Sequence, residues 1–207
     1  PITSPEGRAY FGGMAAAANY AWANRQMITH KVRSVLTRMC GIGYDDIRLV
    51  YDVAHNVAKI EEHTVDEKKV KVCVHRKGAT RAFGPGCPDV PADYAHAGQP
   101  VIIPGSMGSS SFLLKGTDVA MRQTFGSTCH GAGRVLSRSQ AKKKIKGKNI
   151  REILGKAGII VRAPHDGAIA EEAPDAYKSS SEVVSVVHNL GISRLVARLE
   201  PLGVIKG

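Results

Sequence analysis

This chain of 207 residues has few acidic side chains, few aromatic side chains and no long apolar run. A membrane-spanning helix needs about 20 consecutive apolar residues, so we expect no membrane span and no membrane partner. No two of the four cysteines form a C-x-x-C pair, a pattern typical of neither a structural zinc cluster nor a disulfide-dense secreted scaffold. We therefore expect reduced cysteines and a cytoplasmic protein.

Basic residues are abundant by comparison. The chain has 29 lysines and arginines against 18 acidic residues, which gives a formal net charge of +11. Such an excess predicts an anionic partner, with nucleic acid as the first class to consider. Because aromatic residues make up only 5% of the chain, base stacking on an RRM-type sheet is not the expected mode of RNA binding.

Hydrophobic periodicity predicts helices and strands without a steady βαβ alternation. The fold class that this order favours is α+β, with mixed sheets and flanking helices. Helices are expected over residues 8–39, from about residue 133, and over 179–192. Strands are expected over residues 47–60, 69–77, 100–105, 111–116 and 159–163, with a terminal strand pair from residue 195. The acidic connection over residues 61–69 is expected to be exposed.

The stretch "GSTCHGAGRVLSR" places Cys129 and His130 on a turn of small residues just before a basic segment. Arg134, Arg138 and Lys142 lie four apart, so a helix that begins after Gly-Ala-Gly would present them on one face. Its first N–H groups would point at the turn, which predicts an anion site. The lysines that follow are expected to form a solvated face.

Both residues of this turn admit two interpretations. The imidazole of His130 can act as a base, a metal ligand or a nucleophile toward phosphorus, or it can be a packed, hydrogen-bonded histidine. Cys129 can be a thiol of lowered pKa at a helix N-terminus, or a buried structural cysteine.

The turn "PGSMGSSS" offers backbone amides and hydroxyls between two expected strands. It resembles a phosphate cradle but lacks the Gly-Lys-Ser/Thr of a Walker A loop. It is also close to G-x-S-x-G, which would make Ser106 a hydrolase nucleophile. Pro104 in place of the first glycine, and a strand in place of the following helix, argue against a hydrolase.

Two further segments carry candidate residues. His55 and Asn56 stand at the end of an expected strand, where they can be a metal ligand and a base-edge contact or merely turn residues. "HRKGATR" concentrates cations, including Lys77, into a second candidate phosphate clamp. Lys206, near the last residue, follows apolar residues that favour an ordered end.

These stretches, with "MAAAANYAWANRQ", "EEAPDAYKSSSEVV" and the final "GVIKG", resemble the RtcB-type RNA ligases over essentially the whole chain. The resemblance implies an RtcB-like catalytic fold. It also implies a ligase that uses GTP and manganese to join RNA 3′-phosphate or 2′,3′-cyclic phosphate ends to 5′-hydroxyl ends. Such enzymes act in tRNA splicing or RNA repair, and the expected partners are tRNA exon halves or broken RNA and an archease-type activator.

The resemblance also implies roles for individual residues. His130 would attack the α-phosphorus of GTP and carry GMP, and His55 would bind Mn²⁺. Nucleotide contacts would come from Asn56, Pro104, Ser106, Met107, Ser111, Ala132, Gly133, Tyr177 and Lys206. RNA or phosphate contacts would come from Lys77, Arg134 and Arg138.

Family members have a preceding half that supplies an aspartate, a cysteine and two further histidines. Residues 1–207 are therefore expected to be the C-terminal part of a single catalytic domain, inactive as a ligase on its own. The alternative is a non-catalytic nucleotide- or RNA-binding fragment or paralogue.

Overall fold

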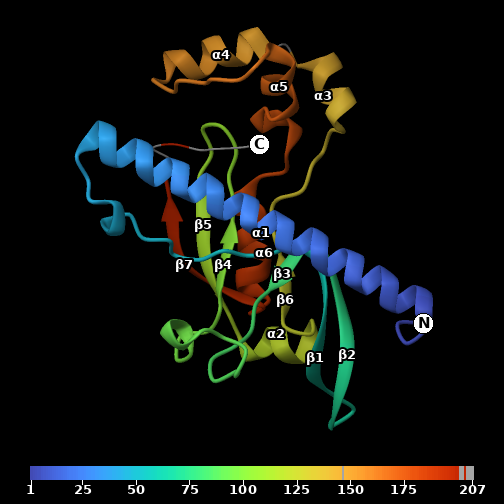
Figure 1. The fold of residues 1–207 in the computed structure, drawn as a ribbon. Helices are drawn as coiled ribbons and strands as arrows, with labels where there is room; N and C mark the ends of the chain where they lie inside the picture. Colours follow the sequence, from blue (N-terminus) through green and yellow to red (C-terminus); the bar gives the residue numbers. More distant parts are fainter. Residues whose placement is uncertain (146, 201–202, 204–207) are drawn as a thin grey trace. The chain divides into compact units, whose positions relative to one another are not determined.

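A computed structural model of the chain describes residues 1–145, 147–200 and 203 (Figure 1). They belong to two compact units, Pro1–Lys77 and Gly78–Gly207, each of which is described by itself. Both units combine helices with small antiparallel sheets, which confirms the α+β prediction. Short 3₁₀ turns occur at Tyr44–Asp46, Ala92–Tyr94 and Pro174–Ala176.

The first unit begins with a helix of 36 residues, α1 (Pro5–Cys40), which confirms the predicted long helix. Ser4 caps its start by accepting a hydrogen bond from the Gly7 N–H at 3.0 Å, and Pro5 occupies the first turn. The helix ends at Gly41, whose φ of 69° favours glycine. Among the described residues, no helix combines the length and apolar character that a membrane span requires.

A hairpin follows, made of β1 (Asn56–Val65) and β2 (Lys68–Lys77). The predicted strand over residues 47–60 begins only at Asn56, and the acidic stretch expected to be exposed is largely strand. Glu61 and His63 are buried there, because the buried Arg76 donates two hydrogen bonds of 2.8 Å to the Glu61 carboxylate. His63 Nε2 lies 3.1 Å from the same carboxylate. The prediction of an exposed connection was wrong for Glu61 and His63, because sequence alone did not reveal this pairing. It is confirmed for Glu62, Thr64 and residues 66–69, which are exposed.

The second unit contains a three-stranded antiparallel sheet with β5 in the middle. The neighbours of β5 (Ser111–Gly116) are β4 (Pro100–Ile103) and β7 (Ser193–Leu199). These strands confirm two predicted strands and the first of the terminal pair; the second of that pair lies beyond residue 200, outside the continuous described range. Two short strands, β3 (Ala79–Arg81) and β6 (Ser127–Cys129), form a separate pair.

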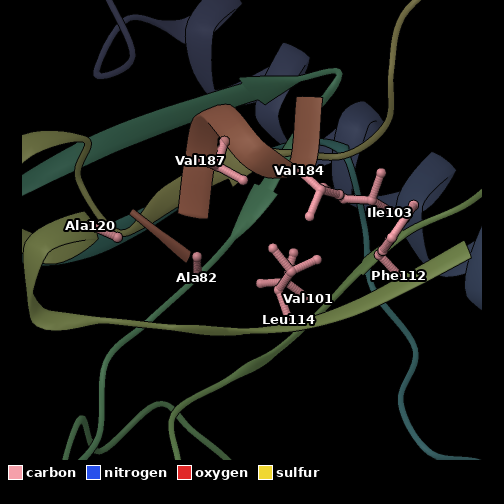
Figure 2. Packing of buried hydrophobic residues seen from close by; sticks show 8 residues of the cluster. All are labelled: Ala82, Val101, Ile103, Phe112, Leu114, Ala120, Val184 and Val187. Carbon is pink, nitrogen blue, oxygen red and sulfur yellow. The ribbon is translucent and has the colours of Figure 1, made fainter. Parts of the chain in front are cut away.

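The core of this unit lies between the sheet and α6 (Ser180–Asn189), a helix that confirms the prediction over 179–192. Figure 2 shows Val184 and Val187 of α6 among the buried side chains of the strands. The other cluster members are Ala82, Val101, Ile103, Phe112, Leu114 and Ala120, the last from α2 (Asp118–Gln123). Each fully buried large apolar side chain stabilises the fold by about 1.5–3 kcal/mol.

The remaining helices are α3 (Arg138–Lys144), α4 (Gly147–Lys156) and α5 (Asp166–Glu171). The helix expected from about residue 133 begins only at Arg138, where Ser137 and Gln140 form a capping box. Arg134 instead forms an antiparallel bridge with Tyr177 and so cannot be helical. The strand expected over residues 159–163 is also absent from the described structure, because that segment has no strand partner.

Candidate functional site

The predicted site residues are divided between the two units. His55, Asn56 and Lys77 belong to the first unit. Lys206 lies outside the described residues. The others belong to the second unit: Pro104, Ser106, Met107, Ser111, His130, Ala132, Gly133, Arg134, Arg138 and Tyr177.

In the first unit the hairpin brings its predicted residues together. Asn56 and Lys77 are register partners where the hairpin opens, and His55 directly precedes Asn56. Burial lowers the pKa of His55, and the nearby charges of Arg25 and Lys77 lower it further. Arg25 is itself held by two hydrogen bonds to Asp52, of 2.7 and 3.2 Å. A neutral imidazole at pH 7 keeps a lone pair for a metal ion or a hydrogen bond.

A complete metal site is not found in the described part of the chain. No group of three or more histidines, cysteines, aspartates or glutamates lies close enough there to hold a metal ion. Manganese is normally held by several nitrogen and oxygen ligands. His55 with the described residues therefore does not fit a whole metal site, and further ligands would be needed.

In the second unit the turn between β4 and β5 is stabilised by hydrogen bonds from its backbone to its own serine hydroxyls. The Gly105 N–H donates to Ser111 Oγ at 2.9 Å, and the Ser106 N–H donates to Ser109 Oγ at 2.6 Å. A Cβ atom on Gly105 would overlap the carbonyl oxygens of Ser109 and Ser110, so this tight turn requires glycine.

Ser106 is only 6% exposed, and its hydroxyl donates to the Glu172 carbonyl at 2.7 Å. In a serine hydrolase this hydroxyl would donate to a histidine base, and a helix would follow the turn. Here the strand β5 follows. The geometry disfavours Ser106 as a nucleophile.

His130 is held where β6 ends. Its backbone N–H donates to the Gly78 carbonyl at 3.3 Å, and its side chain is half-buried with Nδ1 enclosed. Three residues later Gly133 has a φ of 73°, and its carbonyl accepts from the Lys178 N–H at 3.0 Å. The turn is thus fixed at both ends.

Cys129, the residue before His130, is not the activated thiol that one interpretation expected. Burial raises the pKa of its thiol, and the helix N-terminus on which that hypothesis depended lies further along the chain, at α3. Cys129 is a neutral, half-buried neighbour of His130.

Arg134 and Tyr177 form a tightly connected pair beside this turn. The Arg134 guanidinium lies over the Tyr177 ring, 4.6 Å from its centroid, and Nη1 donates to the Tyr177 hydroxyl at 2.7 Å. The Tyr177 hydroxyl donates in turn to Glu172 Oε2 at 2.6 Å. Arg134 Nε donates to the Leu136 carbonyl at 3.0 Å, and Nη2 donates to the Glu171 carbonyl. Much of the hydrogen-bonding capacity of Arg134 is therefore engaged within the protein.

Arg138 lies further into solvent. Its side chain is 72% exposed, and Nε is 3.7 Å from Glu171 Oε2. Lys142, one helical turn on, pairs with Glu171 as well. The hydrogen bond from Lys142 lowers the pKa of the Glu171 carboxyl, and the Lys142 and Arg138 charges add to this effect. The predicted common face of Arg138 and Lys142 is confirmed, and Arg134 lies outside it.

The second candidate clamp differs from the prediction as well. Arg76 is buried against Glu61 and so cannot hold an external phosphate. Arg81 lies over the Phe83 ring, 4.6 Å from the centroid, and 3.9 Å from Asp89. Lys77 is an exposed cation of this segment.

Sequence reasoning missed Glu171 and Glu172, which organise the cations around the second-unit turns. A signal was present in "EEAPDAY", where two adjacent glutamates follow the strongly basic segment over residues 134–151. Apart from Tyr177, five residues from Glu172, their partners could not be read from the sequence because they lie 29 to 66 residues away along the chain.

The second-unit turns carry hydroxyls, cations and a histidine, which are groups that proteins use to bind phosphate. A sequence model of the family described as "RtcB: tRNA-splicing ligase RtcB" matches residues 1–207. The chain belongs to the RtcB family. It is 62% identical over its whole length to a tRNA-splicing ligase RtcB of Archaeoglobus fulgidus, and 58% identical to that of Thermococcus kodakarensis.

The chain spans 43% of the length of each of these two relatives. A tRNA-splicing ligase RtcB of Pyrococcus furiosus is also 58% identical, and the chain spans 22% of it.

Proposed function

We propose that the chain supplies the nucleotide-carrying histidine of an RNA ligase that acts in tRNA splicing or RNA repair. The ligase would join RNA ends that carry a 3′-phosphate or 2′,3′-cyclic phosphate to ends that carry a 5′-hydroxyl, with GTP as the energy source. The observation that carries this proposal is the family match over the entire chain, with His130 fixed where β6 ends, four residues before Arg134.

His130 would act as the nucleophile. Because Nδ1 is enclosed, Nε2 is the nitrogen that would attack the α-phosphorus of GTP. An N–P bond forms, the bond from the α-phosphorus to the bridging oxygen breaks, and pyrophosphate leaves. GMP then passes from the histidine to the RNA 3′-phosphate. The 5′-hydroxyl attacks that phosphate, releases GMP and forms the phosphodiester; cyclic ends are first opened by hydrolysis.

The other predicted residues would bind and orient the substrates. Asn56, Pro104, Ser106, Met107, Ser111, Ala132, Gly133, Tyr177 and Lys206 would surround the guanosine nucleotide. Lys77, Arg134 and Arg138 would hold phosphates or RNA. The exposure of Arg138 and Lys77 supports this role, whereas the internal bonds of Arg134 favour an indirect contribution.

Manganese would neutralise charge on the phosphates when bound. His55 would contribute one ligand, and the remaining ligands would come from outside the described residues. We therefore propose that residues 1–207 do not ligate RNA on their own. An archease-type protein is the proposed activator.

The test uses a chimera in which the matching 43% of the Archaeoglobus fulgidus relative is replaced by this chain. Incubation with GTP and Mn²⁺ should add one GMP to the intact mass, mapped to His130. The adduct should disappear in His130→Ala and persist in the control His96→Ala, which changes an exposed histidine of the same unit. An adduct that survives His130→Ala would contradict the proposed nucleophile.

A non-catalytic nucleotide- or RNA-binding protein is the second candidate. The lack of a three-ligand metal group in the described part of the chain favours it. It predicts salt-sensitive RNA binding by the chimera with no covalent adduct.

A further inference from the structure

We infer that Glu172 is a positioning residue of the proposed nucleotide site, because its carboxylate fixes Tyr177 and Arg134 while its backbone carbonyl fixes Ser106. The inference rests on the proposed function, in which Tyr177 and Ser106 contact the nucleotide. Glu172 belongs to the "EEAPDAY" stretch, but its contacts are visible only in the folded unit.

The carboxylate of Glu172 closes a three-membered network. Tyr177 donates its hydroxyl proton to Oε2 at 2.6 Å, and Arg134 Nη1 lies 3.5 Å from Oε1. Arg134 Nη1 also donates to the Tyr177 oxygen at 2.7 Å. Each member therefore contacts the other two, which holds the Tyr177 ring against the guanidinium that lies over it.

The backbone of Glu172 fixes a second segment. Its carbonyl accepts the Ser106 hydroxyl at 2.7 Å across 66 residues of chain. Its own N–H donates to the Ile169 carbonyl at 3.2 Å, which anchors the residue at the end of α5. One residue thus connects the turn between β4 and β5 with Tyr177.

Burial and charge raise the pKa of the Tyr177 hydroxyl still further above neutral pH. Burial raises the pKa of Tyr177 to about 12, and the hydrogen bond and charge of Glu172 contribute to the rise, against the lowering effects of Arg134 and Arg138. The phenol therefore keeps its proton, and that proton is directed at Glu172. A neutral, oriented ring is what a stacking or hydrogen-bonding contact with a nucleobase requires.

The contribution of Glu172 to folding is expected to be small. Its side chain is 28% exposed and that of Arg134 is 23% exposed, so solvent screens the ion pair. The main effect of the Glu172 carboxylate is then to orient Tyr177. Its removal should therefore weaken nucleotide binding more than it lowers the stability of the fold.

The experiment compares three variants of the chimera: Glu172→Ala, Glu172→Gln and the control Glu152→Ala, an exposed residue of α4. The rate of GMP-adduct formation is measured against GTP concentration. Glu172→Ala should raise KM for GTP about tenfold with little change in kcat, because ground-state positioning is lost. Glu172→Gln keeps an acceptor oxygen for the Tyr177 hydroxyl and should restore most of the affinity.

A second readout needs no GTP. Ionisation of Tyr177 is followed by ultraviolet difference spectra, with Tyr177→Phe to distinguish its signal from those of the other tyrosines of the chimera. Removal of Glu172 should lower the Tyr177 pKa from about 12. An unchanged KM, an unchanged Tyr177 pKa, or a Gln variant as impaired as the Ala variant would each overturn the inference.

Failure of the two proposals can be told apart. If the unsubstituted chimera forms no GMP adduct, the proposed function fails, and the tyrosine titration still decides whether Glu172 fixes Tyr177. If the adduct forms and Glu172→Ala leaves both readouts unchanged, the positioning role alone fails.

Discussion

Asn56 and Lys77 face each other as register partners at the open end of the β1–β2 hairpin. This pairing brings a cation from the end of β2 toward the histidine that precedes β1, and the charge of Lys77 helps to lower the pKa of His55. Residues far apart in the sequence therefore act on one another directly.

The pKa of His55 should depend on the charge of Lys77. We expect Lys77→Gln to raise the pKa of His55 toward its ordinary value of 6.5, though not fully, because burial is the larger cause of the shift. The pKa is measured by NMR, with His55→Gln to assign the resonance. Lys68→Gln, at the opposite end of the same strand, is the matched control and should leave the titration unchanged.

The lowered pKa of His55 also makes the free energy of unfolding depend on pH. Between the folded pKa and 6.5 the unfolded chain binds more protons than the folded chain at His55, so the free energy of unfolding should fall as pH falls through this window. Lys77→Gln should raise the folded pKa of His55 and so narrow the pH range over which stability falls. Unfolding midpoints that do not differ in their pH dependence between Lys77→Gln and the unsubstituted chain would contradict the assigned cause.

The buried ion pair of the hairpin should be costly to break from one side. Glu61→Ala leaves the guanidinium of Arg76, 1% exposed, without its carboxylate, and should destabilise the chain by about 3–5 kcal/mol. The paired replacement Glu61→Leu with Arg76→Met should recover much of this loss, because no uncompensated charge stays buried. Chemical denaturation measures both, and a double variant no more stable than Glu61→Ala would argue against this account.

Two glycines near His130 provide a matched test of backbone strain. A Cβ atom would meet open space at either Gly131 or Gly133, but only Gly133 of the two has a positive φ, 73°. We expect Gly133→Ala to cost about 1–2 kcal/mol of stability and Gly131→Ala to cost clearly less. Thermal unfolding of the two variants decides the point, and equal losses would show that the backbone angle is not the cause.

Arg138 should contribute to RNA affinity by neutralising phosphate charge. Arg138→Gln should weaken RNA binding by the chimera and reduce the slope of log affinity against log salt by about 0.7 for each phosphate of single-stranded RNA that the side chain neutralises. Arg151→Gln is the matched control, because Arg151 is also exposed but pairs with Asp166 at 3.1 Å. The GMP adduct on His130 should form in both variants. An unchanged salt slope in Arg138→Gln would remove that residue from the RNA surface.

Local patterns predicted the elements that depend on local forces. The alanine-rich segment forms a helix because Ser4 and Gly41 cap it and its residues favour helix. The strands around the Pro104–Ser111 turn followed from alternating apolar residues that face the core. The helix expected after Gly133 failed because the tertiary bridge between Arg134 and Tyr177 outweighed a basic, helix-favouring sequence.

The sequence by itself determined the family, the α+β class and the candidate residues, because these depend on residue identity and spacing. Only the tertiary structure decided which charged side chains pair with other groups of the protein. It buried Arg76 against Glu61 and placed Glu172 between Ser106 and Tyr177. The physical reason is that the role of a charged residue depends on the groups nearest to it in space. Those groups lie 5 to 66 residues away along the chain.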